Sequence, residues 1–110
     1  MPEFFSKIVG VTFQNTDGSR RQELIEDLED QLRLLGAVQL HLRREPNNPH
    51  DANAVQVYYG DQQQLGFLSR QVAQTIAPLL DKKISVQCEL AQITGQDLSH
   101  NYGINIKLSY

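Results

Sequence analysis

The sequence has one cysteine, no tryptophan and no long apolar run. A single cysteine excludes a disulfide framework within the chain and is typical of a protein in a reducing compartment. No apolar stretch approaches the roughly 18 residues of a membrane-spanning helix. The first residues, MPEFFSKIVG, lack the basic segment and the apolar stretch of a secretory signal. We therefore expect a cytoplasmic protein with no membrane segment.

A surplus of positive charge is also missing, because 10 lysines and arginines face 13 acidic residues and the formal net charge is −3. This charge argues against non-specific binding of nucleic acid, which normally needs a basic surface. Five of the acidic residues, however, fall within residues 23–30. The other eight are outnumbered by the lysines and arginines. The rest of the surface is therefore expected to be mildly basic.

Alternating apolar residues predict six strands in a chain whose 110 residues are enough for one domain. The predicted strands cover residues 4–14, 38–43, 54–59, 64–68, 84–93 and 104–108. In the first strand, the apolar residues Phe5, Val9, Val11 and Phe13 share odd positions. In the fifth strand, Ile93 breaks the alternation, which predicts a β-bulge near Ala91.

Two helices are predicted between these strands. The first covers residues 19–35, where Ser19 and Gln22 match a capping box and Gly36 is placed as a stop. The second begins after Ser69, and Pro78 is expected to end or kink it. The order β-α-β-β-β-α-β-β predicts a mainly β fold with two helices (α+β), as a small six-stranded barrel or a strongly bent sheet. We expect a single domain over residues 1–110.

The stretch REPNNPHDANAVQV, residues 44–57, separates two predicted strands by more polar positions than a hairpin needs. Its prolines end strands and stiffen a loop, and its asparagines and aspartate favour turns, so the whole stretch can be scaffolding. The alternative is a rigid ligand platform, in which prolines reduce the entropy lost on binding. That platform would offer Asn47, Asn48, His50 and Asp51 to a ligand.

The segment RREPNNPHDANAVQV, followed by LGFLSRQVAQTIAPLLD, resembles the HIRAN domain family. The matching positions are Glu45, Pro46, Asn47, Asp51, Asn53, Ala54 and Gly66. The resemblance covers nearly the whole chain except the acidic helix at 19–35, and several matches in order make it fairly specific. It implies an OB-like or SH3-like barrel that binds single-stranded DNA. In family members fused to helicase-type proteins, the domain captures a 3′ end at a stalled replication fork.

The resemblance also implies roles for individual residues of the central stretch and the second helix. Asp51 stands where the family's aspartate accepts a hydrogen bond from the terminal 3′-hydroxyl. Asn48 stands where an amide holds the end nucleotide or its phosphate, and Arg70 matches a basic phosphate contact. His50 replaces a tyrosine on which a terminal base stacks.

Further aromatic residues are expected in the same groove. Where the family has an arginine before two tyrosines, this chain has Thr12-Phe13-Gln14, so Phe13 keeps one ring. Phe67 replaces a histidine of some members and offers a second ring for stacking. Tyr102, before the last strand, is expected to face the groove as well.

Other functions have weaker support in the sequence. A metal site from His41, His50, Asp51 and His100 lacks any recognisable spacing, so we expect neither a metal nor another cofactor. Cys88 alternates with apolar residues as a buried thiol would, and we do not expect an enzyme. The expected partners are a single-stranded DNA 3′ end and helicase or nuclease proteins. The alternative is a protein-interaction or regulatory module that docks through its acidic helix.

Overall fold

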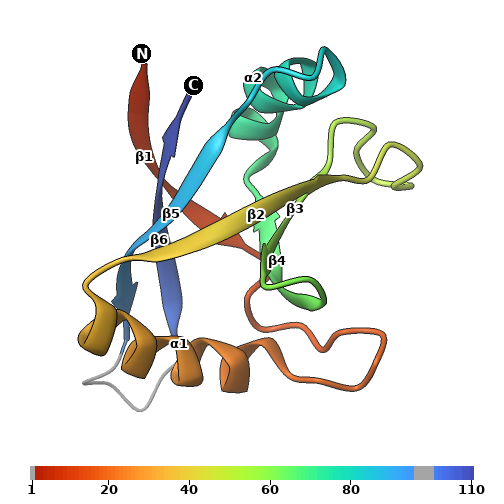
Figure 1. Cartoon of the computed structure of the whole chain (residues 1–110). Coiled ribbons are helices and arrows are strands. Elements are labelled where there is room, and N and C mark those ends of the chain that lie inside the picture. The colour runs from red at the N-terminus through yellow and green to blue at the C-terminus, as the bar shows by residue number, and fades with distance from the viewer. Residues whose placement is uncertain (1, 96–100) are drawn as a thin grey trace.

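The computed structural model describes residues 2–95 and 101–110, which form a closed antiparallel barrel with two helices (Figure 1). The elements are β1 (Glu3–Val9), α1 (Arg21–Leu35), β2 (Val38–Arg44), β3 (Val55–Tyr59), β4 (Gln63–Leu68), α2 (Arg70–Asp81), β5 (Gln87–Thr94) and β6 (Gly103–Ser109). Their order around the barrel is β1-β4-β3-β2-β5-β6. The predicted fold class and element order are therefore confirmed.

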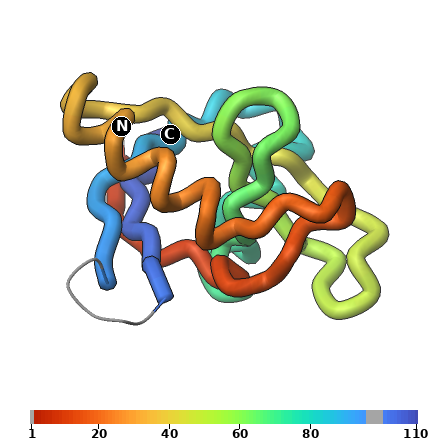
Figure 2. Tube along the Cα trace, turned by 90° about the horizontal axis from the view of Figure 1, so that it is seen from below, coloured from red at the N-terminus to blue at the C-terminus, as the bar shows by residue number. Residues whose placement is uncertain are grey.

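The two helices lie at opposite ends of the barrel (Figure 1). Seen from below, α1 runs across one end, where it buries Ile25 and Leu28 in the core (Figure 2). Helix α2 buries Ala73, Ile76 and Ala77. The strands supply the rest of the core from their alternate positions, such as the Ile104, Ile106 and Leu108 row of β6. No helix within the described residues is long and apolar enough to cross a membrane.

Strand β1 closes the barrel by changing partner along its length. Residues 3–7 pair with β6, whereas Ile8 and Val9 pair with Leu68 and Phe67 of β4. The approach at this second pairing is very close, because a side chain on Gly66 would overlap the carbonyl oxygen of Val9. Glycine at position 66 is therefore a condition for closure, since any Cβ there would separate the two strands.

The first strand is shorter than predicted, and its odd-numbered residues face outward. The strand ends at Val9, and its inner face consists of Ile8 with the half-buried Phe4 and Ser6. The odd-numbered Phe5 is 69% exposed. Both faces of this strand carry apolar residues, so alternation alone could not tell the inner face from the outer one.

The predicted capping box of the first helix was also wrong. Helix α1 begins at Arg21, and its N-cap residue Arg20 makes no side-chain capping bond. The Ser19 hydroxyl instead donates to Oδ1 of Asp17, a bond that lowers the pKa of that carboxyl group. Gln22 bonds the backbone of Tyr102, so its amide joins the helix to the entry of β6.

The second half of the chain follows the predictions more closely. Ser69 accepts a hydrogen bond from the Val72 amide and caps α2, and the register of β5 against β6 shifts between Leu90 and Gln92, where the bulge was expected. Pro78, however, does not end α2, which continues to Asp81. Strand β5 begins at Gln87, later than predicted. Cys88 is buried, as expected, and burial raises the pKa of its thiol to about 12.

Replacing Gly66 with alanine should destabilise the fold by about 2 kcal/mol, because the added methyl group meets backbone and not open space. Chemical denaturation followed by circular dichroism measures this loss. Gly60→Asn is the control, since Gly60 has a φ of 65° and nothing within 4 Å of an added Cβ. Asparagine tolerates this left-handed conformation, so the control should change stability by less than about 0.5 kcal/mol. Equal losses in the two variants would contradict the close approach of β1 and β4.

Candidate functional site

A cavity of about 370 Å³ lies where the end of β1, the loop of residues 45–54, the end of β4 and the start of α2 meet. Its walls are mostly apolar, with a few polar side chains from the loop and the helix. The residues that line it are Val9, Gly10, Phe13, Asn48, His50, Asp51, Ala54, Phe67, Leu68 and Arg70. Six of the seven residues proposed from the sequence are therefore brought together: Phe13, Asn48, His50, Asp51, Phe67 and Arg70.

The loop that forms one wall is held by the side chain of Asn48. Its Oδ1 accepts hydrogen bonds from the backbone N–H groups of His50 (2.8 Å) and Asp51 (3.1 Å). Its Nδ2 donates to a carboxylate oxygen of Glu45 at 2.8 Å. An asparagine amide has two N–H groups, so one remains for a ligand. Most of the hydrogen-bonding capacity of Asn48 thus maintains the loop, and its expected role in holding a nucleotide is reduced to one donor.

Asp51 has one carboxylate oxygen committed to the loop and one that faces a cation. Oδ1 accepts from the Asn53 amide at 2.9 Å, as in an Asx turn. Oδ2 lies 3.9 Å from Nε of Arg70, and the Asp51 side chain is 20% exposed. This second oxygen has capacity to accept a hydrogen bond from a ligand in the cavity.

Arg70 ties the first residue of α2 to the central loop. Its Nη2 donates to the backbone oxygen of His50 at 2.8 Å, while most of its side chain is exposed. The N-terminal end of α2 adds backbone N–H groups, which favour an anion near this edge of the cavity. An anionic group is thus favoured beside Arg70, and a hydroxyl group beside Asp51.

A buried arginine behind the cavity was not found from the sequence. Arg21 is only 6% exposed and donates from Nη1 to the Gly10 oxygen and from Nε to Oδ1 of Asn15. Its guanidinium carbon lies 5.7 Å from the centre of the Phe67 ring, within the range of a cation–π contact. Burial lowers the pKa of Arg21, but an arginine in a protein stays protonated. Arg21 therefore places a positive charge behind an aromatic wall of the cavity.

Helical spacing could have indicated this position, because Arg21 lies four residues before Ile25 on the buried face of α1. Around Gly10, an added Cβ would lie within 4 Å of Arg21, Phe13 and Phe67. The arginine and both rings thus meet at the turn that follows β1.

Tyr102 was expected in the groove, but it is not among the described residues that line the cavity. Its backbone N–H donates to Gln22 of α1 at 2.6 Å, so the residue is attached to the opposite helix. Desolvation and the carboxylates of Glu26 and Glu29 raise the pKa of its hydroxyl group. No local sequence pattern indicates this bond, because its partners are 80 residues apart.

The remaining sequence candidates lie elsewhere. Thr12 and Gln14 line a separate hollow beyond Phe13, together with Arg20 and Gln22. Within residues 2–95 and 101–110, no group of three or more His, Cys, Asp or Glu side chains could hold a metal ion. His100, considered as a metal ligand, lies outside the described residues.

This chain belongs to the HIRAN domain family, whose model matches residues 3–109. The HIRAN domain of human HLTF has the same fold, with a TM-score of 0.60 and 18% identity over 96% of this chain and 74% of that one. The structure of a Lactobacillus plantarum protein aligns with 99% of this chain over 100% of its own length, with a TM-score of 0.50 and 21% identity.

Two curated relatives are larger proteins. The helicase-like transcription factor of Oryctolagus cuniculus is 43% identical over 54 residues, which are 49% of this chain and 5% of that protein. The Fanconi-associated nuclease 1 homolog of Oryza sativa is 33% identical over 76 residues, which are 64% of this chain and 8% of that protein. The chain thus spans less than a tenth of the length of these relatives.

Arg21→Met should destabilise the protein by about 2–3 kcal/mol, because Gly10 and Asn15 lose charged hydrogen-bond donors. Arg21→Lys should lose less stability, since lysine keeps the positive charge. Denaturant titration of each variant measures the loss. Arg20→Met is the matched control: this neighbouring arginine is exposed, and its replacement should change stability by less than about 0.5 kcal/mol. A loss at Arg21 no larger than at Arg20 would refute the anchoring role.

Proposed function

We propose that this chain binds single-stranded DNA at a free 3′-hydroxyl end, in DNA repair or replication-fork processing. Membership of the HIRAN family supports a DNA-binding module. The observation that carries the finer proposal is Oδ2 of Asp51, which lies at an apolar cavity beside Arg70. The names of the two relatives, a helicase-like factor and a nuclease homolog, support helicase or nuclease proteins as partners.

The chemistry of the cavity suits the end of a strand more than its interior. A terminal 3′-hydroxyl can donate to Oδ2 of Asp51, whereas a 3′-phosphate at the same place would be repelled by the carboxylate. The preceding phosphate can be bound by Arg70 and the start of α2. The rings of Phe13 and Phe67 offer stacking surfaces for the terminal base. The volume of about 370 Å³ is within the range of small-ligand sites.

The surrounding charge agrees with a limited, local contact with DNA. The acidic residues of α1, which dominate the net charge, lie on the helix at one end of the barrel (Figure 1). At the cavity itself, the cations are Arg70 at the mouth and Arg21 behind Phe67. A site with few cations should bind a strand through its end and not along a long backbone track.

The unmodified protein should bind a short strand with a 3′-hydroxyl about ten- to a hundredfold more tightly than the same strand with a 3′-phosphate. Asp51→Asn should remove most of this preference, because the amide neither repels a phosphate nor accepts as strongly. Fluorescence anisotropy with a 5′-labelled strand measures both affinities.

Asp61→Asn is the matched control for Asp51, since Asp61 is an exposed aspartate in the turn between β3 and β4. It should leave the preference unchanged. An Asp51→Asn variant that still prefers the hydroxyl end would refute the assigned role of Asp51. Absence of binding to any strand at low salt would favour the alternative of a protein-interaction module.

Binding through phosphates weakens as salt rises. The logarithm of the binding constant falls against the logarithm of the salt concentration with a slope of about 0.7 for each phosphate contacted on a single strand. Arg70→Gln should therefore weaken binding and reduce the slope by about 0.7. Arg43→Gln removes the same charge from an arginine that stacks on Tyr58, 4.1 Å from its ring centre and outside the cavity lining. Equal effects of the two variants on the slope would contradict a specific phosphate contact at Arg70.

A further inference from the structure

The outer face of β1 leads away from the cavity and carries exposed apolar and basic side chains. Val9 is 44% exposed and lines the cavity, whereas Phe5 is 69% exposed and lies near the other end of the strand. Lys7 is exposed between them on the same face. These three side chains alternate with the inner-facing ones, so they form one row on the surface.

The strand register joins this row to its neighbours. Val9 pairs with Phe67, a wall of the cavity. Lys7 pairs with Asn105, which in turn pairs with Gln92. The face is therefore continuous from the cavity across β1 and β6 to β5.

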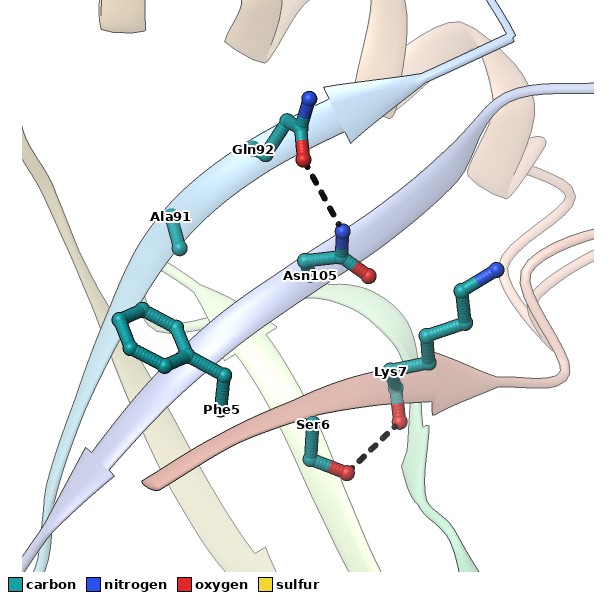
Figure 3. Close-up of a pocket in the computed structure, with 6 residues that line it drawn as sticks. All are labelled: Phe5, Ser6, Lys7, Ala91, Gln92 and Asn105. Atoms are coloured by element: carbon teal, nitrogen blue, oxygen red, sulfur yellow. Dashed lines mark hydrogen bonds between the residues drawn. The ribbon is translucent and has the colours of Figure 1, made fainter. Parts of the chain in front are cut away.

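A second hollow, of about 660 Å³, lies at the far part of this face. It is lined by Phe5, Ser6, Lys7, Ala91, Gln92 and Asn105. Figure 3 shows the Phe5 ring projecting from β1 toward Ala91 across β6, and Lys7 projecting from the same strand beside Asn105. The bulge between Leu90 and Gln92 turns the small Ala91 outward, which leaves open space next to the Phe5 ring.

We propose that a bound single strand continues from the cavity along the outer face of β1, past Lys7, and stacks a base on Phe5. This inference rests on the proposed function and extends it to nucleotides on the 5′ side of the end. Val9 and Phe5 are four residues apart, which is about 13 Å along a strand. Such a path makes the site several nucleotides long, within the range of OB-like folds.

The chemistry of the face matches this ligand. An exposed aromatic ring stacks on any base, and a lysine on the same row can bind the phosphates between bases. Among the ion pairs of the described residues, Lys7 takes part in none, whereas Lys107 is paired with Glu89 at 3.7 Å. The amides of Gln92 and Asn105, 3.2 Å apart, offer further hydrogen bonds. Glu3, beyond Phe5 on β1, places a negative charge that limits the path at that end.

A peptide fits this face less well. A strand of another protein would add at the edge of β1 residues 3–7, which pair with β6 but not with β4, so it would not occupy the outer face. The apolar side chains Phe5 and Ala91 border one hollow, but Lys7 separates them from Val9 along β1, so the face lacks one continuous apolar patch. An exposed ring beside a lysine that makes no ion pair within the described residues is instead typical of surfaces that bind single-stranded nucleic acid.

The experiment compares thymidine strands of three and eight nucleotides, each prepared with a 3′-hydroxyl and with a 3′-phosphate, by calorimetry on the full chain. The eight-nucleotide strand should bind more tightly than the three-nucleotide strand. Phe5→Ala should weaken binding of the longer strand about tenfold and leave binding of the shorter strand unchanged. Tyr58→Ala is the matched control, because Tyr58 is an aromatic residue of β3, whose sheet partners are β2 and β4 and not the strands of the path. It should affect neither strand.

The two proposals fail in different ways. Suppose that the short 3′-hydroxyl strand binds selectively, but the longer strand binds no more tightly or is unaffected by Phe5→Ala. This result would overturn the path on β1 and leave end recognition intact. A longer strand that depends on Phe5 but shows no preference for the 3′-hydroxyl would support the path and overturn end recognition. Binding of neither strand would overturn both. Circular dichroism of Phe5→Ala checks that this surface substitution preserves the fold.

Discussion

The pairing of two residues of β1 with two residues of β4 determines how the rest of the molecule is arranged. Where Ile8 meets Leu68 and Val9 meets Phe67, the sheet closes into a barrel. The same pairing brings Gly10 and Phe67 together and puts Arg21 behind them. It also decides which face of β1 enters the core. The cavity and the exposed row of Phe5, Lys7 and Val9 are thus two results of one closure.

The parts that line the cavity differ in how firmly hydrogen bonds hold them. The central loop is fixed by hydrogen bonds of Asn48, and α2 is joined to it through Arg70. The turn after β1 is fixed by Arg21, which is bound to two of its residues. The ring of Phe13, by contrast, is 65% exposed. The cavity therefore has two walls held by hydrogen bonds and one exposed ring.

Much of this arrangement could be predicted from the sequence, because its signals are local. The bulge near Ala91, the Ser69 cap and the polar loop each depend on residues that are neighbours along the chain. The facing of β1 could not be predicted, since both its faces are apolar and closure with β4 decides between them. The positions of Arg21 and Tyr102 depend on contacts between distant segments, to which alternation and capping patterns are insensitive.

The hydrogen bonds of the central loop have a consequence for how this domain can diversify. At His50, only backbone atoms take part in the hydrogen bonds found among the described residues: the N–H to Asn48 and the oxygen to Arg70. The imidazole at the cavity is therefore not needed to build the loop. A substitution at position 50 can therefore change the lining of the cavity at little cost to the folding of the loop.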